Sequence, residues 1–477
     1  MDREIETFIK HFVQELDENN AAIFAGAGLS ASAGYVNWKE LLRPLSEELG
    51  VDIDAEHDFV SLAQYHYNDN GRHGINQQLL REIASSKRPS DNHRILARLP
   101  ISTYWTTNYD KLIEVALEDS GKIGDVKYTG NHLAMTKPNR HAIVYKMHGD
   151  IDHPDTAVIT KDDYEKYAID HALYVNALAG DLISKTFLFL GFSFTDPNLD
   201  YVMSRIRISL HDNQRPHFCI FRRCAVDDFE DEETFNQATI KQQLAIKDLK
   251  RFQVKTLLVD SYAEITDILK KIERAYKRKT VFISGSAHDF SPWNREDVED
   301  FLCKLGSILI DQEYRLSSGI GLGIGNAVIT GAITEVYKRH NRKIEDHITM
   351  RPFPQFIEDP DERMSTWKAY RHEIIGHAGI ALFFMGNKNT EGGVVLADGV
   401  KEEFDIAYEL GLAVIPIGVS GYMAKNLWDD VMGHLEKYYP NASDEFIEKL
   451  KELGAPIDRP DQLISKIMDT INLISKE

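Results

Sequence analysis

The sequence has few cysteines and no long apolar run. Its 477 residues include only Cys219, Cys224 and Cys303, which are too few for a disulfide framework or a four-cysteine zinc site. No uninterrupted apolar stretch reaches the roughly 20 residues needed to span a bilayer. The N-terminus, MDREIETFIKHFVQELDENN, is acidic and amphipathic, unlike a secretory signal. We therefore expect a cytoplasmic protein that binds neither a metal nor a membrane.

The chain is also poor in positive charge. Its 55 Lys and Arg face 75 Asp and Glu, which gives a formal net charge of −20. Binding to the phosphate backbone of a nucleic acid needs a basic face, so we expect no nucleic-acid partner. A nucleotide ligand is still possible, because backbone N–H groups and helix N-termini can hold phosphates locally.

Strand-like apolar runs alternate with amphipathic helical stretches along the whole chain. This alternation predicts an α/β protein with parallel sheets, and the length favours two domains. A basic run at 277–279 precedes a fresh apolar strand, so we expect one domain over 1–276 and another over 279–477. The predicted strands cover 21–26, 101–108, 142–149, 185–194, 217–223 and 254–260, then 280–287, 314–319, 379–386 and 412–418.

Small and polar residues gather where four of the first-half strands end. In parallel α/β sheets, ligands bind at this edge. Each cluster has a simpler interpretation, because a glycine turn can be only tight, Asn and Asp can cap a helix, and a lone His can be structural. The residues concerned are Gly26, Ala27, Gly28 and Ser30, then Asn108 and Asp110, then His148, and finally Gly191 and Ser193, followed by Asp196 and Asn198.

The second half carries a second glycine-rich turn, LSSGIGLGIGN, between a strand and a helix. Alternating glycines allow backbone N–H groups to point at an anion, although a flexible surface hairpin would look similar. Charged residues that suit phosphates and ribose follow near later strand ends: Arg351, Arg371, Lys388 and Glu403. Each of these, taken singly, could equally be a solvated surface charge.

The ordered set GAGLS, TTNYD, MHGD and GFS resembles the sirtuin (Sir2) NAD-binding fold over about residues 1–275. The resemblance implies that NAD⁺ is bound by Gly26, Ala27, Gly28, Ser30, Asn108, Asp110, His148, Gly191 and Ser193. It makes His148 the general base and Asn108 the second catalytic residue, which orients the ribose or a water.

Protein-deacylating sirtuins carry a zinc ribbon of two CxxC pairs after the HG motif, and no cysteine lies between His148 and Gly191 here. The resemblance therefore favours NAD⁺ hydrolysis to ADP-ribose and nicotinamide. The alternatives are a protein deacylase or ADP-ribosyl transferase, and a non-catalytic nucleotide-binding scaffold.

Residues 279–477 resemble a SLOG domain, the nucleotide-binding superfamily that includes the LOG phosphoribohydrolases. The matching segments are VFISGSA, SSGIGLGIG and GGVVLADGVKEE, the last an eroded form of a Pro-Gly-Gly-x-Gly-Thr-x-x-Glu signature. The erosion favours ligand sensing over hydrolysis by this domain.

The order of the two domains, sirtuin-like and then SLOG, resembles that of the effectors of bacterial Thoeris anti-phage defence. This resemblance implies a partner TIR-domain protein whose cyclic ADP-ribose isomer binds the SLOG domain and switches on NAD⁺ depletion. It also implies a homotetramer. The implied effector-binding residues are Gly285, Ser286, Leu322, Gly323, Arg371, Lys388, Gly399 and Glu403.

Overall fold

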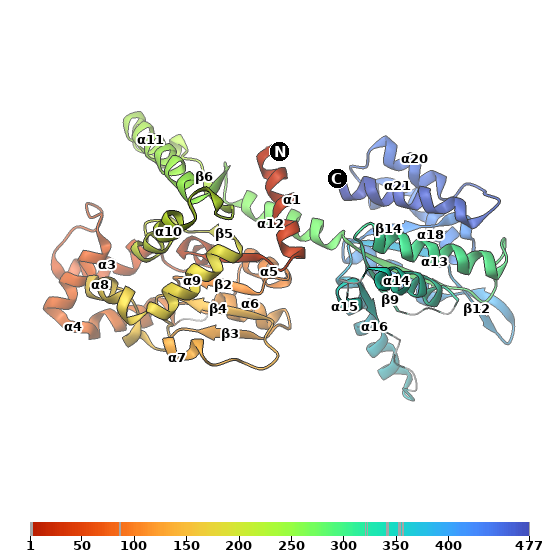
Figure 1. Cartoon of the computed structure of the whole chain (residues 1–477), viewed down its shortest axis with the longest axis horizontal. Coiled ribbons are helices and arrows are strands. Elements are labelled where there is room, and N and C mark those ends of the chain that lie inside the picture. The colour runs from red at the N-terminus through yellow and green to blue at the C-terminus, as the bar shows by residue number, and fades with distance from the viewer. Residues whose placement is uncertain are drawn as a thin grey trace. The chain divides into compact units, whose positions relative to one another are not determined.

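The computed structural model of the chain describes residues 3–84, 87–319, 321, 323–339, 343–351, 354 and 357–476. The chain forms two compact units, Met1–Glu273 and Arg274–Glu477, called here the first and the second unit (Figure 1). The division falls within helix α12 (Ala263–Lys277). Both units are built on parallel sheets, which confirms the predicted fold class.

The first unit has a seven-stranded sheet in the order β3-β4-β2-β1-β5-β6-β7, with every neighbouring pair parallel. The strands are β1 (Ala21–Ala25), β2 (Thr103–Thr106), β3 (Gly124–Lys127), β4 (Ala142–Lys146), β5 (Thr186–Leu190), β6 (His217–Arg222) and β7 (Val254–Val259).

The register of the central strands decides where the site lies. Ala25 pairs with Thr106 on one side and with Leu190 on the other, and Thr106 pairs with Lys146. The last residues of β1, β2, β4 and β5 are therefore level with one another. The loops that follow them leave the sheet at one edge, as expected for the carboxyl ends of parallel strands.

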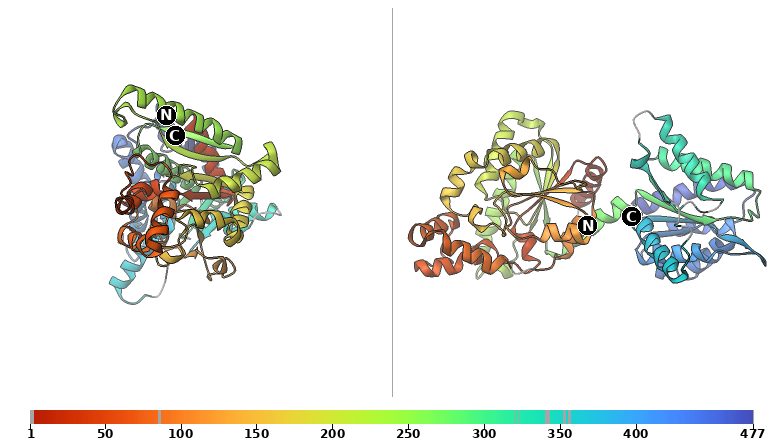
Figure 2. Two further views of the ribbon diagram at one scale, coloured as in Figure 1. Left: turned by 90° about the vertical axis from the view of Figure 1, so that its left-hand side faces the viewer. Right: turned by 90° about the horizontal axis from the view of Figure 1, so that it is seen from below.

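Helices cover both faces of this sheet (Figure 2). They bury all five residues of β1 and of β5, as is typical of strands in the middle of a doubly covered sheet. The helices are α1 (Arg3–Asp17), α2 (Ala27–Ala31), α3 (Trp38–Leu49), α4 (Phe59–Ile83), α5 (Asp91–Arg98), α6 (Leu112–Asp119), α7 (Gly130–Leu133), α8 (Lys161–Asp170), α9 (Ala172–Ser184), α10 (Pro197–Leu210) and α11 (Glu232–Leu249), with α12 as the last.

The second unit has a five-stranded parallel sheet in the order β10-β9-β8-β11-β14. Its strands are β8 (Thr280–Ser286), β9 (Arg315–Ser318), β10 (Ile348–Met350), β11 (Ile380–Met385) and β14 (Ala413–Pro416); β12 (Asn387–Thr390) and β13 (Gly393–Leu396) form a separate antiparallel hairpin. Its helices are α13 (Arg295–Asp311), α14 (Gly325–Lys338), α15 (Ile344–His347), α16 (Pro360–Gly376), α17 (Asp398–Glu409), α18 (Tyr422–Gly433), α19 (Leu435–Tyr438), α20 (Asp444–Glu452) and α21 (Leu463–Lys476).

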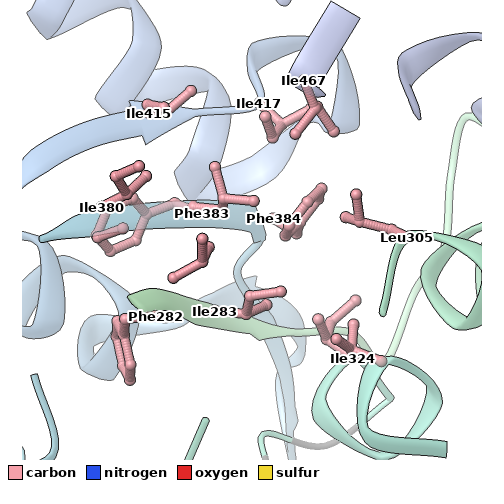
Figure 3. Close-up of a cluster of buried hydrophobic side chains, with 14 of the residues drawn as sticks. Phe282, Ile283, Leu305, Ile324, Ile380, Phe383, Phe384, Ile415, Ile417 and Ile467 are labelled. Atoms are coloured by element: carbon pink, nitrogen blue, oxygen red, sulfur yellow. The ribbon is translucent and has the colours of Figure 1, made fainter. Parts of the chain in front are cut away.

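The core of the second unit also anchors its glycine-rich turn. Ile283 on β8 and Phe384 on β11 are buried next to Ile324, the residue just before α14 (Figure 3). Fully burying an Ile side chain stabilises a fold by about 1.5–3 kcal/mol. The buried Ile324 therefore holds the start of α14 against the end of β8.

Four strands of the structure were not predicted from the sequence: β3, β10, β12 and β13. All four are short, with three or four residues each. Strand β13 contains the first three of the five residues that separate the double glycine at 392–393 from Gly399. Over the described residues, no helix is long and apolar enough to cross a membrane, and no group of three or more His, Cys, Asp or Glu could hold a metal ion.

Candidate functional site

Three glycines hold two loops of the first unit against each other. Gly26 donates its N–H to Leu190 O (2.9 Å), and Gly28 donates to Gly191 O (2.9 Å). Gly191 has φ +64, and a Cβ built on it would lie 2.1 Å from Leu29 N. A side chain at Gly191 would push the loops apart. Close packing thus explains these glycines by itself, and a ligand site must rest on the polar groups around them.

Those polar groups form one hydrogen-bonded chain. Asn108 donates its backbone N–H to Thr106 Oγ1 (2.9 Å) and its side-chain Nδ2 to Gly26 O (3.0 Å) and Ser30 Oγ (2.9 Å). Ser30 Oγ donates to Asp110 Oδ2 (2.7 Å). Since a carbonyl oxygen can only accept, the contact with Gly26 fixes which end of the Asn108 amide is nitrogen. Both amide hydrogens are used, so Oδ1 is the Asn108 atom left for a ligand.

His148 follows β4 and is almost fully buried. Its Nε2 lies 3.2 Å from Oδ2 of Asp196, and the edges or faces of Tyr164 and Tyr167 approach its ring at centroid distances of 5.4 and 6.2 Å. Burial would raise the pKa of Asp196, but the electrostatic interaction with His148 and hydrogen bonds from two backbone amides outweigh it and hold that pKa below its ordinary value. Asp196 is therefore a carboxylate at neutral pH.

A buried lysine supports the loop that carries Asn108. The Nζ of Lys146 lies 2.6 Å from Asp150 Oδ2 and 3.2 Å from Glu114 Oε1, and it donates to the carbonyls of Tyr109 (3.0 Å) and Asp110 (2.5 Å). Burial would lower the pKa of Lys146, but Glu114 and Asp150 raise it above its ordinary value. A fixed positive charge thus ties the β2–α6 loop to the segment after β4.

These strand ends open into one pocket of about 800 Å³, a volume within the usual range for ligand pockets. Eight of the nine residues predicted to bind NAD⁺ line it, namely Ala27, Gly28, Ser30, Asn108, Asp110, His148, Gly191 and Ser193. Gly26 is not among the lining residues and instead supports Asn108 through its carbonyl.

Other walls of the pocket were not predicted. They include Tyr35, Trp38, Asp58, Lys161 and Tyr164, from α3 and α8 and from the segments just before α3 and α4. Their segments carry ordinary helix-forming and helix-capping sequences, so nothing in the sequence marked them. Asp196 also lines the pocket. The sequence analysis placed Asp196 in the polar cluster after the fourth strand and predicted no role for it.

In the second unit, three predicted effector residues lie together, one on α16 and two on α17. Arg371 Nη1 donates to Glu402 Oε2 (2.5 Å), and Arg371 Nε lies 3.6 Å from Glu403 Oε1. Ser284 donates to Glu403 Oε2 (2.6 Å), and a Cβ built on Gly399 would lie 3.1 Å from Arg371 Nη2. Burial raises the pKa of Glu403, although Ser284 and Arg371 oppose that rise. The structure thus brings Arg371, Gly399 and Glu403 together beside β8.

The glycine-rich turn lies against the same strand end. A Cβ built on Gly285 would lie 2.6 Å from Phe384 O and 3.2 Å from Ile324, and one on Gly323, whose φ is +79, would lie 2.6 Å from Ala287 O. Both positions therefore require glycine. Leu322, the remaining residue predicted in this turn, lies outside the described residues.

Ser286 and Lys388 are linked through the β12–β13 hairpin. Ser286 Oγ donates to the carbonyl of Asn387 (3.1 Å), the residue before Lys388. Lys388 Nζ donates to Asp398 Oδ2 (2.9 Å), and both side chains are largely exposed. Asp398 precedes Gly399, so Lys388 is tied to the segment that approaches Arg371.

A cavity of about 570 Å³ in the second unit has a different lining. His288, Phe290, Arg295 and Asn326 line it, and Gly323 is the predicted effector residue that it includes. Arg371, Lys388, Gly399 and Glu403 do not line this cavity. Two distinct places in the second unit could therefore receive a polar ligand.

Family comparisons match both units. A family model described as a SIR2-like domain matches residues 102–244. A model described as the Sir2- and TIR-associating SLOG family matches residues 264–474. These matches confirm the sirtuin-like and SLOG resemblances in the expected order along the chain.

Full-length relatives agree with the family models. The chain is 55% identical over 480 residues to the NAD(+) hydrolase ThsA of Acinetobacter baumannii (strain 532279), covering 99% of this chain and 100% of that protein. Its identity to the NAD(+) hydrolase ThsA of Bacillus cereus (strain MSX-D12) is 48%, covering 99% and 98% of the two chains. Its identity to the protein of that name from Cytobacillus dafuensis is 46%, covering 91% and 90%.

Proposed function

The chain belongs to the ThsA family of NAD(+) hydrolases, and we propose that its first unit cleaves NAD⁺ in the pocket beside Asn108 and His148 while its second unit binds the signal that controls the cleavage. As a member of this family it is an NAD⁺ hydrolase and takes part in anti-phage defence. The assignment of the reaction to named residues is our proposal. The observation that carries it is the Asn108–Ser30–Asp110 chain, which meets the pocket that His148 lines.

The reaction breaks the bond between C1′ of the nicotinamide ribose and the pyridinium nitrogen. The electron pair of that bond goes to nicotinamide, which leaves as a neutral molecule. A water oxygen forms the new bond to C1′, and the proton that it loses passes to His148. The products are ADP-ribose and nicotinamide. General bases of this kind typically contribute about 10²- to 10⁴-fold in rate.

Asn108 suits the positive charge that develops on the ribose. Its amide is fixed by Gly26 and Ser30, so Oδ1 presents a partial negative charge in a set direction. A pre-oriented dipole of this kind costs no reorganisation when the transition state forms. Asp110 holds Ser30 and thereby the Asn108 amide. We assign Asn108 to orienting the ribose or the attacking water.

Release of nicotinamide from NAD⁺ by the full chain, with the cyclic ADP-ribose isomer added, tests this assignment. We expect Asn108→Ala and His148→Ala to lower kcat by about 10²- to 10⁴-fold. Asn70→Ala and His73→Ala change the same residue types at exposed positions on α4 and should behave as the wild type. Wild-type rates in both site variants would remove these residues from the mechanism.

We assign control of the enzyme to a cyclic ADP-ribose isomer made by a partner TIR-domain protein. The description of the matching SLOG family as TIR-associating supports a TIR-linked partner. A nearly buried Arg371 next to Glu403 supports a ligand with both phosphate and ribose groups. In this assignment Arg371 and Lys388 bind the phosphates, and Glu403 binds a ribose hydroxyl.

Two arginines distinguish the two places in the second unit where the isomer could bind. Arg371→Ala should abolish activation by the isomer, whereas Arg295→Ala, in the other cavity, should leave it intact. The reverse result would move the effector to the cavity beside His288. Activation can follow only if the isomer prefers one conformational state of the protein over another.

We also propose that the protein acts as a homotetramer assembled through its first unit. Helices α8 and α9 of that unit expose Ile169, Leu173 and Ile183, and burying exposed apolar residues between copies of the chain favours association. Sedimentation of the full chain tests this. A monomer at assay concentration would contradict the proposal without affecting the assignment of the active site.

A further inference from the structure

The two carboxylate oxygens of Asp196 make different contacts. Oδ1 caps helix α10, because it accepts the backbone N–H groups of Asn198 (2.9 Å) and Leu199 (3.0 Å). Pro197 is the first residue of the helix, where its missing N–H costs nothing. Oδ2 takes no part in the cap and lies 3.2 Å from Nε2 of His148. The cap alone leaves the second oxygen unexplained.

Helix α16 begins with a similar Asp-Pro cap, whose aspartate does not contact a histidine in the described residues. Asp359 precedes Pro360 and accepts the N–H groups of Asp361 (2.9 Å) and Glu362 (2.8 Å) with Oδ1. Asp359 is exposed, whereas the side chain of Asp196 is 9% exposed. Burying a carboxylate is unfavourable unless it is paired. The burial of Asp196 beside His148 therefore requires a partner that capping does not supply.

The other titratable side chains packed near His148 are neutral, whereas Asp196 is charged. Tyr164 and Tyr167 approach the ring, but burial raises both of their pKa values well above the ordinary value. Both phenols are therefore neutral at physiological pH. His171 lies close enough to interact with His148, and burial lowers its pKa, so it too is neutral. Asp196 is the negative charge that faces the imidazole.

We propose that Asp196 is a positioning residue for NAD⁺ cleavage: its carboxylate, 3.2 Å from Nε2, holds the imidazole of His148 in place and stabilises the imidazolium that forms when His148 takes a proton. A carboxylate at Nε2 favours the tautomer with hydrogen on that nitrogen. Nδ1 is then the basic atom, and it receives the proton that the attacking water loses. The inference deepens the proposed function and rests on His148 as the general base.

The test replaces the charge while it keeps the cap. Asp196→Asn leaves an N-cap of equal quality, because Asn and Asp cap helices equally well. We expect kcat for nicotinamide release by the full chain to fall between about 10-fold and 10⁴-fold, the range found for carboxylates that orient a histidine, with KM unchanged. Asp359→Asn is the matched control and should keep the wild-type kcat.

A double variant separates positioning from a general structural role. If Asp196 acts through His148, then His148→Ala and His148→Ala/Asp196→Asn have the same residual rate, measured over hours with NAD⁺ labelled in nicotinamide. Asp196→Ser, which also caps, is the substitute if Asp196→Asn melts below the wild type. A wild-type kcat in Asp196→Asn, or a further loss in the double variant, would overturn the inference. A wild-type chain that releases no nicotinamide even with the cyclic ADP-ribose isomer present would instead refute the hydrolase assignment, and this inference with it.

Discussion

Removing the positive charge of Lys146 should destabilise the first unit more than any other single lysine substitution near the site. Its Nζ is fully buried between Asp150 and Glu114, whose side chains are 5% and 17% exposed. In Lys146→Met the chain keeps a side chain of similar length. Two buried carboxylates and two loop carbonyls, those of Tyr109 and Asp110, then lose their shared donor.

The expected loss follows from the burial. Breaking a buried ion pair by removing one partner costs about 3–5 kcal/mol, because the other charge is left buried and unpaired. Stability of native proteins is only about 5–15 kcal/mol, so the loss is a large fraction of it. At roughly 2–4 °C per kcal/mol for a domain of this size, the Tm of the first unit should fall by about 6–20 °C.

Thermal and urea unfolding of the full chain measure this loss. Lys111→Met is the matched control: its side chain is 44% exposed and pairs with Asp152 at the surface, and exposed pairs contribute at most about 1 kcal/mol. Adding Glu114→Gln to Lys146→Met removes one of the stranded charges and should restore part of the Tm. Equal melting of Lys146→Met and Lys111→Met would refute the reasoning.

The pH dependence has a definite sign. Burial raises the pKa of Glu114, and the charge of Lys146 opposes that rise; without Lys146 the rise is larger. A carboxyl whose folded pKa lies above its unfolded value adds stability at low pH that is lost as pH rises through the folded pKa. The deficit of Lys146→Met should therefore be smaller near about pH 5 than near about pH 8.

Three further changes test other parts of the structure. Gly191→Ala should destabilise the first unit by about 2–5 kcal/mol, from the left-handed φ and the clash together, whereas Gly180→Ala, in an open helical position, should raise its Tm slightly. Glu402→Gln frees Arg371 from a competing carboxylate. It should lower the isomer concentration needed for half-activation by about two- to fivefold. An increase in that concentration would mean that Glu402 only orients Arg371. Thr106→Val removes the acceptor of the Asn108 N–H and should cost about 1–3 kcal/mol in unfolding free energy, measured by urea titration.

Much of the fold could be predicted because its central strands are continuous apolar runs. The strands β1 and β5 are buried along their whole length, so every residue in them is apolar or small and the strand is recognisable from the sequence. The short strand β3, GDVK, alternates in burial and contains Asp125 and Lys127, which pair with each other. Its strand conformation comes from pairing with β4, and such pairing leaves little trace in a four-residue sequence.

The same limit applies within the site. The polar strand ends were visible because each lies directly after an apolar run. The contacts between them were not, because the partners are far apart in sequence: Ser30 bonds Asp110 across 80 residues, and His148 meets Asp196 only when β4 and β5 lie in one sheet. Lys146 looked like one polar residue in a strand. Its buried position depends on Glu114 of α6 and on carbonyls of another loop.

The polar groups of the two proposed sites are arranged differently, and this difference fits their proposed roles. Around Asn108, donors and acceptors are satisfied by neighbours, and one amide oxygen keeps a fixed direction. A site arranged in advance suits catalysis, because little reorganisation is needed at the transition state. In the second unit, Arg371 is paired with Glu402, and Lys388 is paired with Asp398. A phosphate ligand must displace these carboxylates before it gains the cations. Such displacement lowers affinity and sets a threshold concentration, which suits a sensor better than a catalyst.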